Sequence, residues 1–310
     1  MKIIFAANFS QTSNEWLDAL RNAMPECEII AWDESTPRTD AEIAVVWSPS
    51  PSLLVREPNI RALFNMGAGV DALLSLPGLS DKVSIYRLED AGMSAQMAEY
   101  VVYYLVRASR GFDHFERAQQ QEKWDKTPDI QRDQWPVGVM GLGLMGAKVA
   151  EVIASLDYPV AGWSNTQKNI PGVESFAGVG QLKQFLQRSR VLVNILPLTS
   201  ETSGILNFEN MSLLISGAYI INVGRGGHLV EDDLIRLLEV GHVSGATLDV
   251  FRQEPLPQGH QFWSHPKINI TPHIAAATLL NQTTQQLSNK IRDFVHGKHV
   301  TGQVRHGRGY

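Results

Sequence analysis

The first part of the chain, up to about residue 90, consists of short apolar runs that alternate with segments of helical periodicity. Between the first two runs, Trp16, Leu20 and Met24 are spaced so that they line one face of a helix. This alternation of strands and helices predicts a parallel sheet covered by helices on both faces. The strands expected here are Ile3–Ala7, Glu28–Trp32, Ile43–Trp47, Ala62–Met66 and Val83–Leu88.

A second alternating series follows a long helical segment, expected from about Ser94 to Lys123, and a polar connection that contains Pro128. Its apolar runs are more continuous, which is typical of strands buried on both faces of a parallel sheet. A last helix is expected from about Leu279 to Val295. The pattern therefore predicts an α/β protein with two parallel sheets. The strands expected in the second series are Pro136–Met140, Val160–Trp163, Val191–Leu196, Tyr219–Val223, Ala246–Val250 and Ile268–Ile270.

Composition and charge narrow the class of protein. With 310 residues, of which 44% are hydrophobic and 19% charged, the chain is long enough for two domains with separate cores. A net charge of −5 argues against a surface for nucleic acids or anionic membranes, which needs an excess of basic residues. No apolar run is long enough to span a bilayer or to form a secretory signal. Cys27 is the only cysteine, so no intrachain disulfide is possible and a cytoplasmic protein is expected.

A glycine-rich turn, Gly141–Gly146, stands between an expected strand and an expected helix. In the pattern GxGxxG, the first glycine permits a tight turn, the second lets the backbone approach a pyrophosphate, and the third lets helix and strand pack closely. The helix N-terminus then offers N–H groups and a partial positive charge to the phosphates. With strand, helix and a further strand in order, the turn predicts dinucleotide binding.

The end of the next strand indicates which dinucleotide binds. An NAD site usually has Asp or Glu there, which binds the ribose 2′-OH. This chain has no carboxylate in the segment Ser164–Lys168. Hydroxyls, an amide and Lys168 suit a 2′-phosphate, so NADPH is expected, with NADH as the alternative. The alternative interpretation of Lys168 is a solvated lysine of a loop.

Three groups that can do chemistry follow three strands of the second series. Arg225 comes after Tyr219–Val223, Glu254 lies in the loop after the next strand, and His273 follows the last one. Because ligands of open α/β sheets bind outside the carboxyl ends of the strands, these residues are expected at the same edge as the glycine-rich turn.

These residue types match the reduction of a 2-keto acid. An arginine holds a substrate carboxylate through charge-assisted hydrogen bonds. A protonated imidazole supplies the proton that the carbonyl oxygen needs, and a neighbouring carboxylate keeps that imidazole protonated near neutral pH. We therefore expect Arg225 to clamp the substrate and polarise its carbonyl, His273 to act as acid and base, and Glu254 to support His273.

Taken singly, each group also has a structural interpretation. Arg225 beside glycines can cap a helix, and Asp249 can cap the following turn as well as accept a hydrogen bond from the nicotinamide carboxamide. Asn194 and Thr199 are expected to border the adenosine. His260 and His265 lie in a loop without further ligands, so no metal site is expected.

Together these motifs resemble the D-isomer-specific 2-hydroxyacid dehydrogenase family, and within it the bacterial glyoxylate/hydroxypyruvate reductases. The wider resemblance rests on Gly141–Gly146, on Asn222–Gly226, on Thr247–Phe251 with Glu254–Pro257, and on Thr271–His273. The narrower one rests on segment 64–71, on Trp163 with Ser164, and on the tail segments Thr301–Val304 and Arg308–Tyr310. NADP-preferring relatives tend to have arginine after the Trp-Ser pair, where this chain has Asn165 and Gln167.

The resemblance implies two doubly wound α/β domains with a cleft between them. Residues 1–97 with 277–310 would form a flavodoxin-like substrate domain that the C-terminal helix completes, and residues 98–276 a Rossmann-type cofactor domain. The substrate would contact Trp47, Ala68, Gly69, Arg225 and His273. A homodimer is implied, with the long helix after Ser94 in the interface. The expected cofactor contacts are Gly141, Gly143, Leu144, Met145, Gly146, Ser164, Asn165, Thr166, Lys168, Leu196, Pro197, Val223, Gly224 and Asp249.

The expected activity is the NADPH-dependent reduction of glyoxylate to glycolate and of hydroxypyruvate to D-glycerate. One alternative is a D-2-hydroxyacid dehydrogenase for a larger side chain. Another is a dinucleotide-sensing protein with little turnover, which would not need Arg225, Glu254 and His273 together.

Overall fold

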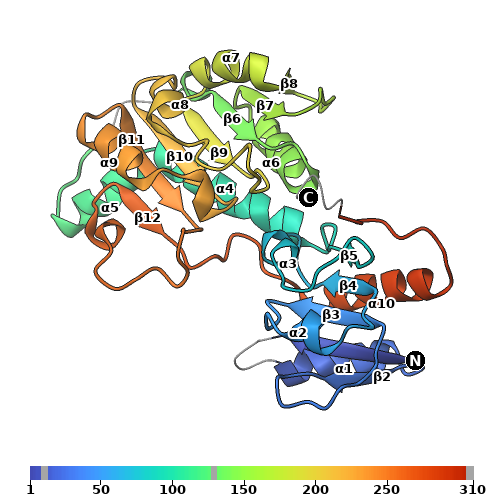
Figure 1. Cartoon of the computed structure of the whole chain (residues 1–310). Helices are drawn as coiled ribbons and strands as arrows, with labels where there is room; N and C mark the ends of the chain where they lie inside the picture. Colours follow the sequence, from blue (N-terminus) through green and yellow to red (C-terminus); the bar gives the residue numbers. More distant parts are fainter. Residues whose placement is uncertain (8–12, 127–130, 305–310) are drawn as a thin grey trace. The chain divides into compact units, whose positions relative to one another are not determined.

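A computed structural model describes residues 1–7, 13–126 and 131–304 of the chain (Figure 1). The chain divides into two compact units. The first unit comprises Met1–Gly92 and Thr278–Tyr310, and the second comprises Met93–Ala277. Pro128, expected in the connection after the long helix, lies outside the described residues. The same holds for the tail segment Arg308–Tyr310, on which part of the family resemblance rests.

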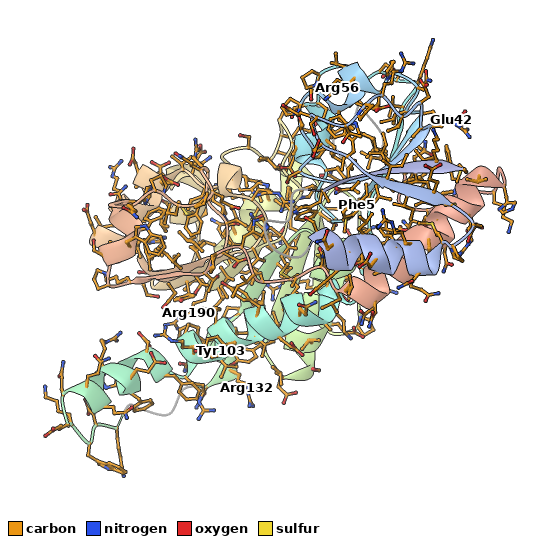
Figure 2. All side chains as sticks on the ribbon, turned by 90° about the horizontal axis from the view of Figure 1, so that it is seen from below. Phe5, Glu42, Arg56, Tyr103, Arg132 and Arg190 are labelled. Carbon is orange, nitrogen blue, oxygen red and sulfur yellow. The ribbon has the colours of Figure 1, made fainter. Side chains whose placement is uncertain are left out.

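The first unit contains a five-stranded parallel sheet with the strand order β2-β1-β3-β4-β5, a doubly wound order of the flavodoxin type. Strand β1 is buried along most of its length, including Phe5, which is labelled in Figure 2. As the resemblance implies, α10 (Leu280–Val295) returns to this unit and packs against α1 (Ser13–Ala23). The other elements are β1 (Lys2–Ala7), β2 (Glu28–Ala31), β3 (Ile43–Trp47), α2 (Leu53–Arg56), β4 (Ala62–Asn65), α3 (Asp71–Leu74) and β5 (Ser84–Tyr86).

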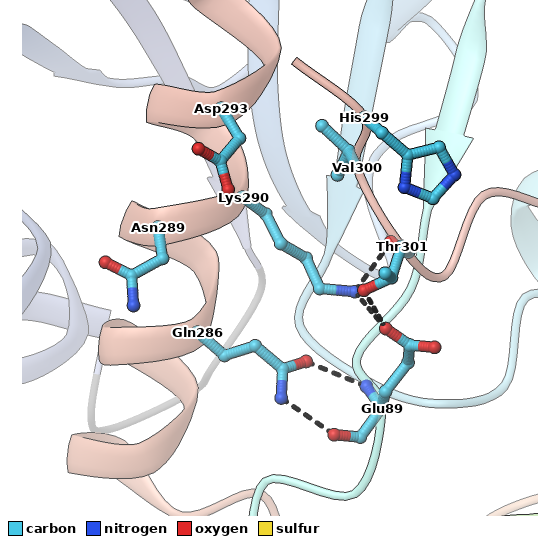
Figure 3. A pocket seen from close by; sticks show the side chains of 8 residues that line it. All are labelled: Glu89, Gln286, Asn289, Lys290, Asp293, His299, Val300 and Thr301. Atoms are coloured by element: carbon cyan, nitrogen blue, oxygen red, sulfur yellow. Dashed lines mark hydrogen bonds and ion pairs between the residues drawn. The ribbon is translucent and has the colours of Figure 1, made fainter.

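A buried ammonium group fastens the last described segment to α10 in the first unit. Lys290 donates hydrogen bonds to the carbonyl oxygens of Arg87 and Thr301, both at 2.9 Å. It also donates to the Glu89 carboxylate at 3.0 Å, and Figure 3 shows its bonds to Thr301 and Glu89. Thr301 also donates to Glu89, and Gln286 pairs with the backbone of Glu89 on both sides. All three hydrogens of the ammonium therefore have an acceptor, which a buried charge requires.

The second unit contains a seven-stranded parallel sheet with the order β12-β11-β10-β9-β6-β7-β8. Read from β8, its first six strands have the Rossmann order, and β12 extends the sheet beyond β11. The direction of winding changes between β6 and β9, so this is the switch point where doubly wound sheets bind ligands. The strands are β6 (Val137–Met140), β7 (Val160–Ser164), β8 (Val173–Ala177), β9 (Val191–Asn194), β10 (Ala218–Asn222), β11 (Val243–Leu248) and β12 (Ile268–Ile270).

Helices cover both faces of this second sheet, as the continuous apolar runs predict. On one face, Val139 and Val193 pack with apolar residues of α4 and α6. On the other face, Leu192 and Ile220 pack with residues of α7, α8 and α9. The helices are α4 (Met93–Ser109), α5 (Phe112–Gln120), α6 (Leu144–Ser155), α7 (Leu182–Gln187), α8 (Phe208–Ser212) and α9 (Glu231–Glu239), with short 3-10 turns at Arg132–Gln134, Val179–Gln181, Gly226–His228 and Gln261–Ser264.

The structure corrects several predictions about elements. The single helix expected from Ser94 to Lys123 is broken at Gly111, whose left-handed φ of 63° ends α4 and starts α5. Strand β8 (Val173–Ala177) was missed because it lies at the edge of the sheet and alternates with polar residues, so it lacks a long apolar run. The strands expected to end at Leu196 and Val250 end earlier, at Asn194 and Leu248, which places Leu196 and Asp249 in the loops at the sheet edge.

Candidate active site

The glycine-rich turn has the geometry that dinucleotide binding requires. Gly141 has a φ of 98°, which L side chains rarely adopt, so the tight turn after β6 depends on glycine. A Cβ on Gly146 would lie 1.7 Å from the Gly141 carbonyl oxygen, so the first turn of α6 also needs a glycine. Gly143 faces open space, with no atom within 4 Å of a Cβ built there. The turn therefore leaves room for a phosphate group at the N-terminus of α6.

The segment after β7 presents polar groups without a carboxylate. Asn165, Thr166 and Lys168 are exposed, and the Ser164 hydroxyl donates to the carbonyl oxygen of Thr166 at 2.8 Å. The Lys168 N–H donates to the Ser175 hydroxyl at 3.0 Å, which ties the segment to β8. An exposed lysine and neighbouring hydroxyls can bind a 2′-phosphate, and this segment has no carboxylate that would repel the phosphate.

The loops after β9 and β10 are joined by two buried amide side chains. Asn194 donates to the Asn222 side-chain oxygen at 2.9 Å, and its own oxygen accepts from the Leu196 N–H at 3.3 Å. Both asparagines are completely buried, so a ligand has no access to Asn194 and the expected contact of this residue with adenosine is wrong. Asn194 instead stiffens the loop that carries Leu196 and Pro197, on which cofactor contacts are expected.

Arg225 is half-buried and begins the short 3-10 turn after β10, so it does cap a helical turn, as one of the two interpretations held. Its guanidinium donates to the carbonyl oxygen of Gly224 at 2.7 Å. The next residue, Gly226, is pressed against the loop after β11, because a Cβ there would lie 1.9 Å from the carbonyl carbon of Phe251. The backbone at Arg225 is thus locked to the loop that contains Glu254.

Glu254 and His273 form the pair that the sequence predicts. His273 Nδ1 lies 2.8 Å from the Glu254 carboxylate, whose other oxygen accepts from the Phe251 N–H at 2.9 Å. Partial burial acts to raise the pKa of Glu254. The hydrogen bonds from His273 and Phe251, together with the charges of His273 and Arg225, outweigh burial and hold the pKa of this carboxyl below its usual value. The carboxylate therefore stays ionised near neutral pH and lies against the imidazole of His273.

The His273 backbone is held in an uncommon conformation by Asp249. His273 has a φ of 56°, and its N–H donates to the Asp249 carbonyl oxygen at 2.9 Å. The buried Asp249 carboxylate accepts from the N–H groups of Ile274 and Ala275 at 2.8 and 2.9 Å. Asp249 thus caps the segment that carries His273, as one of its two interpretations held.

A hydroxyl chain extends this support to α4. Thr271 donates to Asp249 at 2.6 Å, and the Tyr100 hydroxyl lies 2.5 Å from the Thr271 oxygen. Because the single Thr271 hydrogen points to the carboxylate, Tyr100 is the donor to Thr271. Burial, together with the charge of Asp249, raises the pKa of the Tyr100 phenol, which keeps this donor protonated. No sequence signal assigns a role to Tyr100, because α4 precedes the strands of this sheet and lies far along the chain from Thr271.

The residues expected to contact substrate from the first unit surround a rigid turn after β4. The Asn65 side chain donates to the carbonyl oxygens of Gly67 and Gly69 at 3.0 and 2.7 Å. A Cβ on Gly67 would lie 2.3 Å from the Trp47 ring, so this ring packs directly on the turn. Ala68 is half-buried and Gly69 exposed.

A polar hollow of about 250 Å³ lies elsewhere in the first unit, between Glu89, Lys290 and Thr301 (Figure 3). Because every hydrogen of the Lys290 ammonium already has a protein acceptor, we interpret this hollow as part of the contact between α10 and the last described segment, not as a ligand site. Among the described residues, no group of three or more His, Cys, Asp or Glu side chains is placed to hold a metal ion. In the same part of the chain, no helix combines the length and apolarity needed to cross a membrane.

Comparison with known proteins supports this account of the two units. Residues 102–275 match the model of the D-isomer specific 2-hydroxyacid dehydrogenase, NAD binding domain. The chain is 42% identical over 309 residues to glyoxylate/hydroxypyruvate reductase A of Serratia proteamaculans, with 98% of each chain covered.

Solved structures of similar proteins agree over the whole chain. A D-isomer specific 2-hydroxyacid dehydrogenase from Xanthobacter autotrophicus Py2, in complex with NADPH and MES, is 37% identical with a TM-score of 0.93 and covers 100% of this chain and 99% of that one. The NADPH-dependent glyoxylate/hydroxypyruvate reductase from Sinorhizobium meliloti, in complex with NADP and sulfate, is 33% identical with a TM-score of 0.94 at the same coverage. With its glycine-rich turn, its strand-end residues and these relatives, the chain belongs to the D-isomer specific 2-hydroxyacid dehydrogenase family.

Proposed function

We propose that this protein reduces small 2-keto acids with NADPH, converting glyoxylate to glycolate and hydroxypyruvate to D-glycerate. The observation that carries the proposal is the 2.8 Å contact between His273 and Glu254, at the sheet edge that also bears Arg225 and the glycine-rich turn. Relatives with this activity in their names, from Serratia proteamaculans and Sinorhizobium meliloti, support the substrate class.

Each of the three polar residues has a separate task in this reaction. When bound, NADPH supplies the hydride that reduces the keto carbon. Arg225 holds the substrate carboxylate and polarises the carbonyl. His273 gives a proton from Nε2 to the carbonyl oxygen as charge develops there, because Nδ1 is engaged by Glu254. Glu254 stabilises the charged imidazole before the proton leaves.

The cofactor residues follow from the geometry of the second unit. Backbone N–H groups at Gly143, Leu144 and Met145 would hold the pyrophosphate at the N-terminus of α6. Ser164, Asn165, Thr166 and Lys168 would hold the 2′-phosphate, so NADPH is preferred over NADH. The NADPH and NADP complexes of related structures support this preference. The remaining contacts are proposed for Gly141, Gly146, Leu196, Pro197, Val223, Gly224 and, to the carboxamide, Asp249.

The first unit is proposed as the substrate domain and the second as the cofactor domain. Asn65 stiffens the turn at Ala68 and Gly69, which is suited to bind the substrate carboxylate through backbone N–H groups. Trp47, packed against the same turn, would form a wall of the substrate pocket.

A homodimer is proposed with α4 and α5 in its interface. Tyr103, labelled on α4 in Figure 2, is 59% exposed, Phe112 is 41% exposed and Trp124 is 95% exposed. Tyr103 and Phe112 line a mainly apolar groove with Val102 and Val106. An exposed apolar groove such as the one at Tyr103 and Phe112 is typical of a surface that another chain covers. A cytoplasmic location stays a prediction from the single cysteine.

The direct test is the oxidation of NADPH, followed by absorbance, with glyoxylate and then hydroxypyruvate, repeated with NADH. Turnover with NADPH supports both the proposed reaction and the preference for NADPH over NADH. Turnover with NADH alone overturns the cofactor preference and leaves the reaction standing. A strong preference for phenylpyruvate would favour the alternative of a larger side chain, and cofactor binding without turnover would favour a dinucleotide sensor.

A further inference from the structure

A second histidine lies beneath Arg225, outside the residues assigned to the reaction. His228 is completely buried at the end of the 3-10 turn after β10. Its Nδ1 lies 3.1 Å from the backbone nitrogen of Arg225 and 3.1 Å from the carbonyl oxygen of the same residue. Its Nε2 lies 3.2 Å from the carbonyl oxygen of Pro197. One imidazole thus bridges the Arg225 turn and the loop after β9.

The partners of the two ring nitrogens determine where the proton sits. The Pro197 carbonyl oxygen only accepts, so Nε2 carries the hydrogen. Nδ1 faces both the Arg225 N–H, which donates to it, and the Arg225 carbonyl oxygen, which already accepts from the Asn222 side chain. With that oxygen supplied by Asn222, the acceptor role is assigned to Nδ1 and the hydrogen to Nε2. A hydrogen on Nδ1 would remove the bond from the Arg225 N–H.

The surroundings leave this ring little freedom. A Cβ on Gly224 would lie 3.1 Å from His228 Nδ1 and 2.9 Å from the Asn194 side chain. The Arg225 carbonyl oxygen also accepts from the Asn222 side chain at 3.3 Å. The backbone on both sides of Arg225 is consequently fixed by buried side chains.

We propose that His228 is a positioning residue, which sets the backbone of Arg225 through Nδ1 and couples it to the cofactor-side loop through Nε2. The inference rests on the proposed role of Arg225 as substrate clamp. An arginine whose backbone shifts loses the bidentate geometry that a carboxylate needs, so the keto acid binds more weakly. A buried histidine that only fills space would not depend on which ring nitrogen keeps its partner.

Two substitutions separate the two hydrogen bonds. His228→Asn keeps an acceptor near the Nδ1 position and loses the link to Pro197. His228→Gln keeps a donor near the Nε2 position and loses the acceptor for Arg225. We expect H228Q to raise the KM for glyoxylate about tenfold, the usual effect of one lost hydrogen bond, while H228N stays within about threefold of the original value. The matched control is His242→Gln, since His242 bonds the Met211 carbonyl oxygen in the same unit, away from Arg225.

A spectroscopic measurement accompanies the kinetics. In the unsubstituted protein, the ¹⁵N signals of His228 should show a hydrogen on Nε2 and a bare Nδ1. A proton on Nδ1 would overturn the inference, even if H228Q failed to fold. Equal KM values for H228Q and H228N would also overturn it.

Arg225→Lys distinguishes this inference from the proposed function. If R225K raises the KM strongly and the two His228 variants behave alike, the positioning role is wrong and the clamp stands. If R225K leaves the KM unchanged, the clamp itself is wrong. Thermal melting of every variant shows whether a change in KM follows a loss of stability.

Discussion

Two pairs of a basic and an acidic side chain, one in each unit, have nearly the same separation and differ in the burial of the basic partner. His273 and Glu254 lie 2.8 Å apart with side chains 45% and 36% exposed. Lys290 and Glu89 lie 3.0 Å apart with side chains 8% and 32% exposed. Lys290 has an acceptor for each hydrogen, whereas His273 uses Nδ1 and the described residues place no partner at Nε2. An exposed ion pair in which one nitrogen has no protein partner is available to a ligand. A buried ion pair whose hydrogen bonds are all made within the protein stabilises the fold.

The largest expected effect is on catalysis. His273→Ala should lower kcat with glyoxylate by roughly 10²–10⁴-fold, the usual contribution of a general acid. Binding of NADPH, measured by fluorescence titration, should change little, because the role proposed for His273 is on the substrate. If turnover stays nearly unchanged, the His273–Glu254 pair has no catalytic role that distinguishes it from the Lys290–Glu89 pair.

The saturated pair should affect stability instead. Lys290→Met removes the ammonium, so the Glu89 carboxylate keeps only the Thr301 hydroxyl as a side-chain donor and the carbonyl oxygens of Arg87 and Thr301 lose the Lys290 donor. We expect a loss of about 2–3 kcal/mol in the free energy of unfolding, less than for a fully buried pair because Glu89 is partly exposed. Chemical denaturation measures the loss. The kcat of the folded variant should match that of the unsubstituted protein, and a large fall in kcat would contradict the structural role.

The charge of Glu254 should set the pH range of the reaction. Because its pKa is lowered in the folded protein, the pairing with His273 stabilises the fold above the usual pKa of glutamate and is lost as pH falls through the lowered value. Glu254→Gln removes the negative charge beside the His273 imidazole. The kcat/KM for glyoxylate should fall, and its dependence on pH should differ from that of the unsubstituted protein. An unchanged pH profile of kcat/KM would mean that Glu254 only anchors the loop. The control is Glu116→Gln on α5, which removes an exposed carboxylate elsewhere in the same unit.

The smallest effect is expected from the support behind His273. Tyr100→Phe removes the donor to Thr271 but keeps the ring. Loss of one neutral hydrogen bond, worth about 1 kcal/mol, should lower kcat several-fold at most. Thermal stability should fall in parallel. Tyr103→Phe, on the exposed side of α4, is the matched control, and equal kcat values for the two variants would show that Thr271 holds its position without Tyr100.

Local pattern and chain order were enough to predict the class of fold and the residues proposed for the chemistry. Continuous apolar runs predicted parallel strands, since only a sheet covered on both faces buries such runs. The places of Gly141–Gly146, Arg225, Glu254 and His273 followed from one rule, that the carboxyl ends of parallel strands meet at one edge. Each of these inferences needs only local pattern and chain order.

Tertiary structure decided the features that depend on contacts between distant segments. The break at Gly111, the edge strand β8 and the burial of Asn194 have no strong local signature. The supporting roles of His228 and Tyr100 arise because Pro197 and Thr271, far away in sequence, present oxygen atoms to them. Hydrogen-bond partners of buried polar groups are fixed by packing, so a sequence indicates which groups need partners but not which groups supply them.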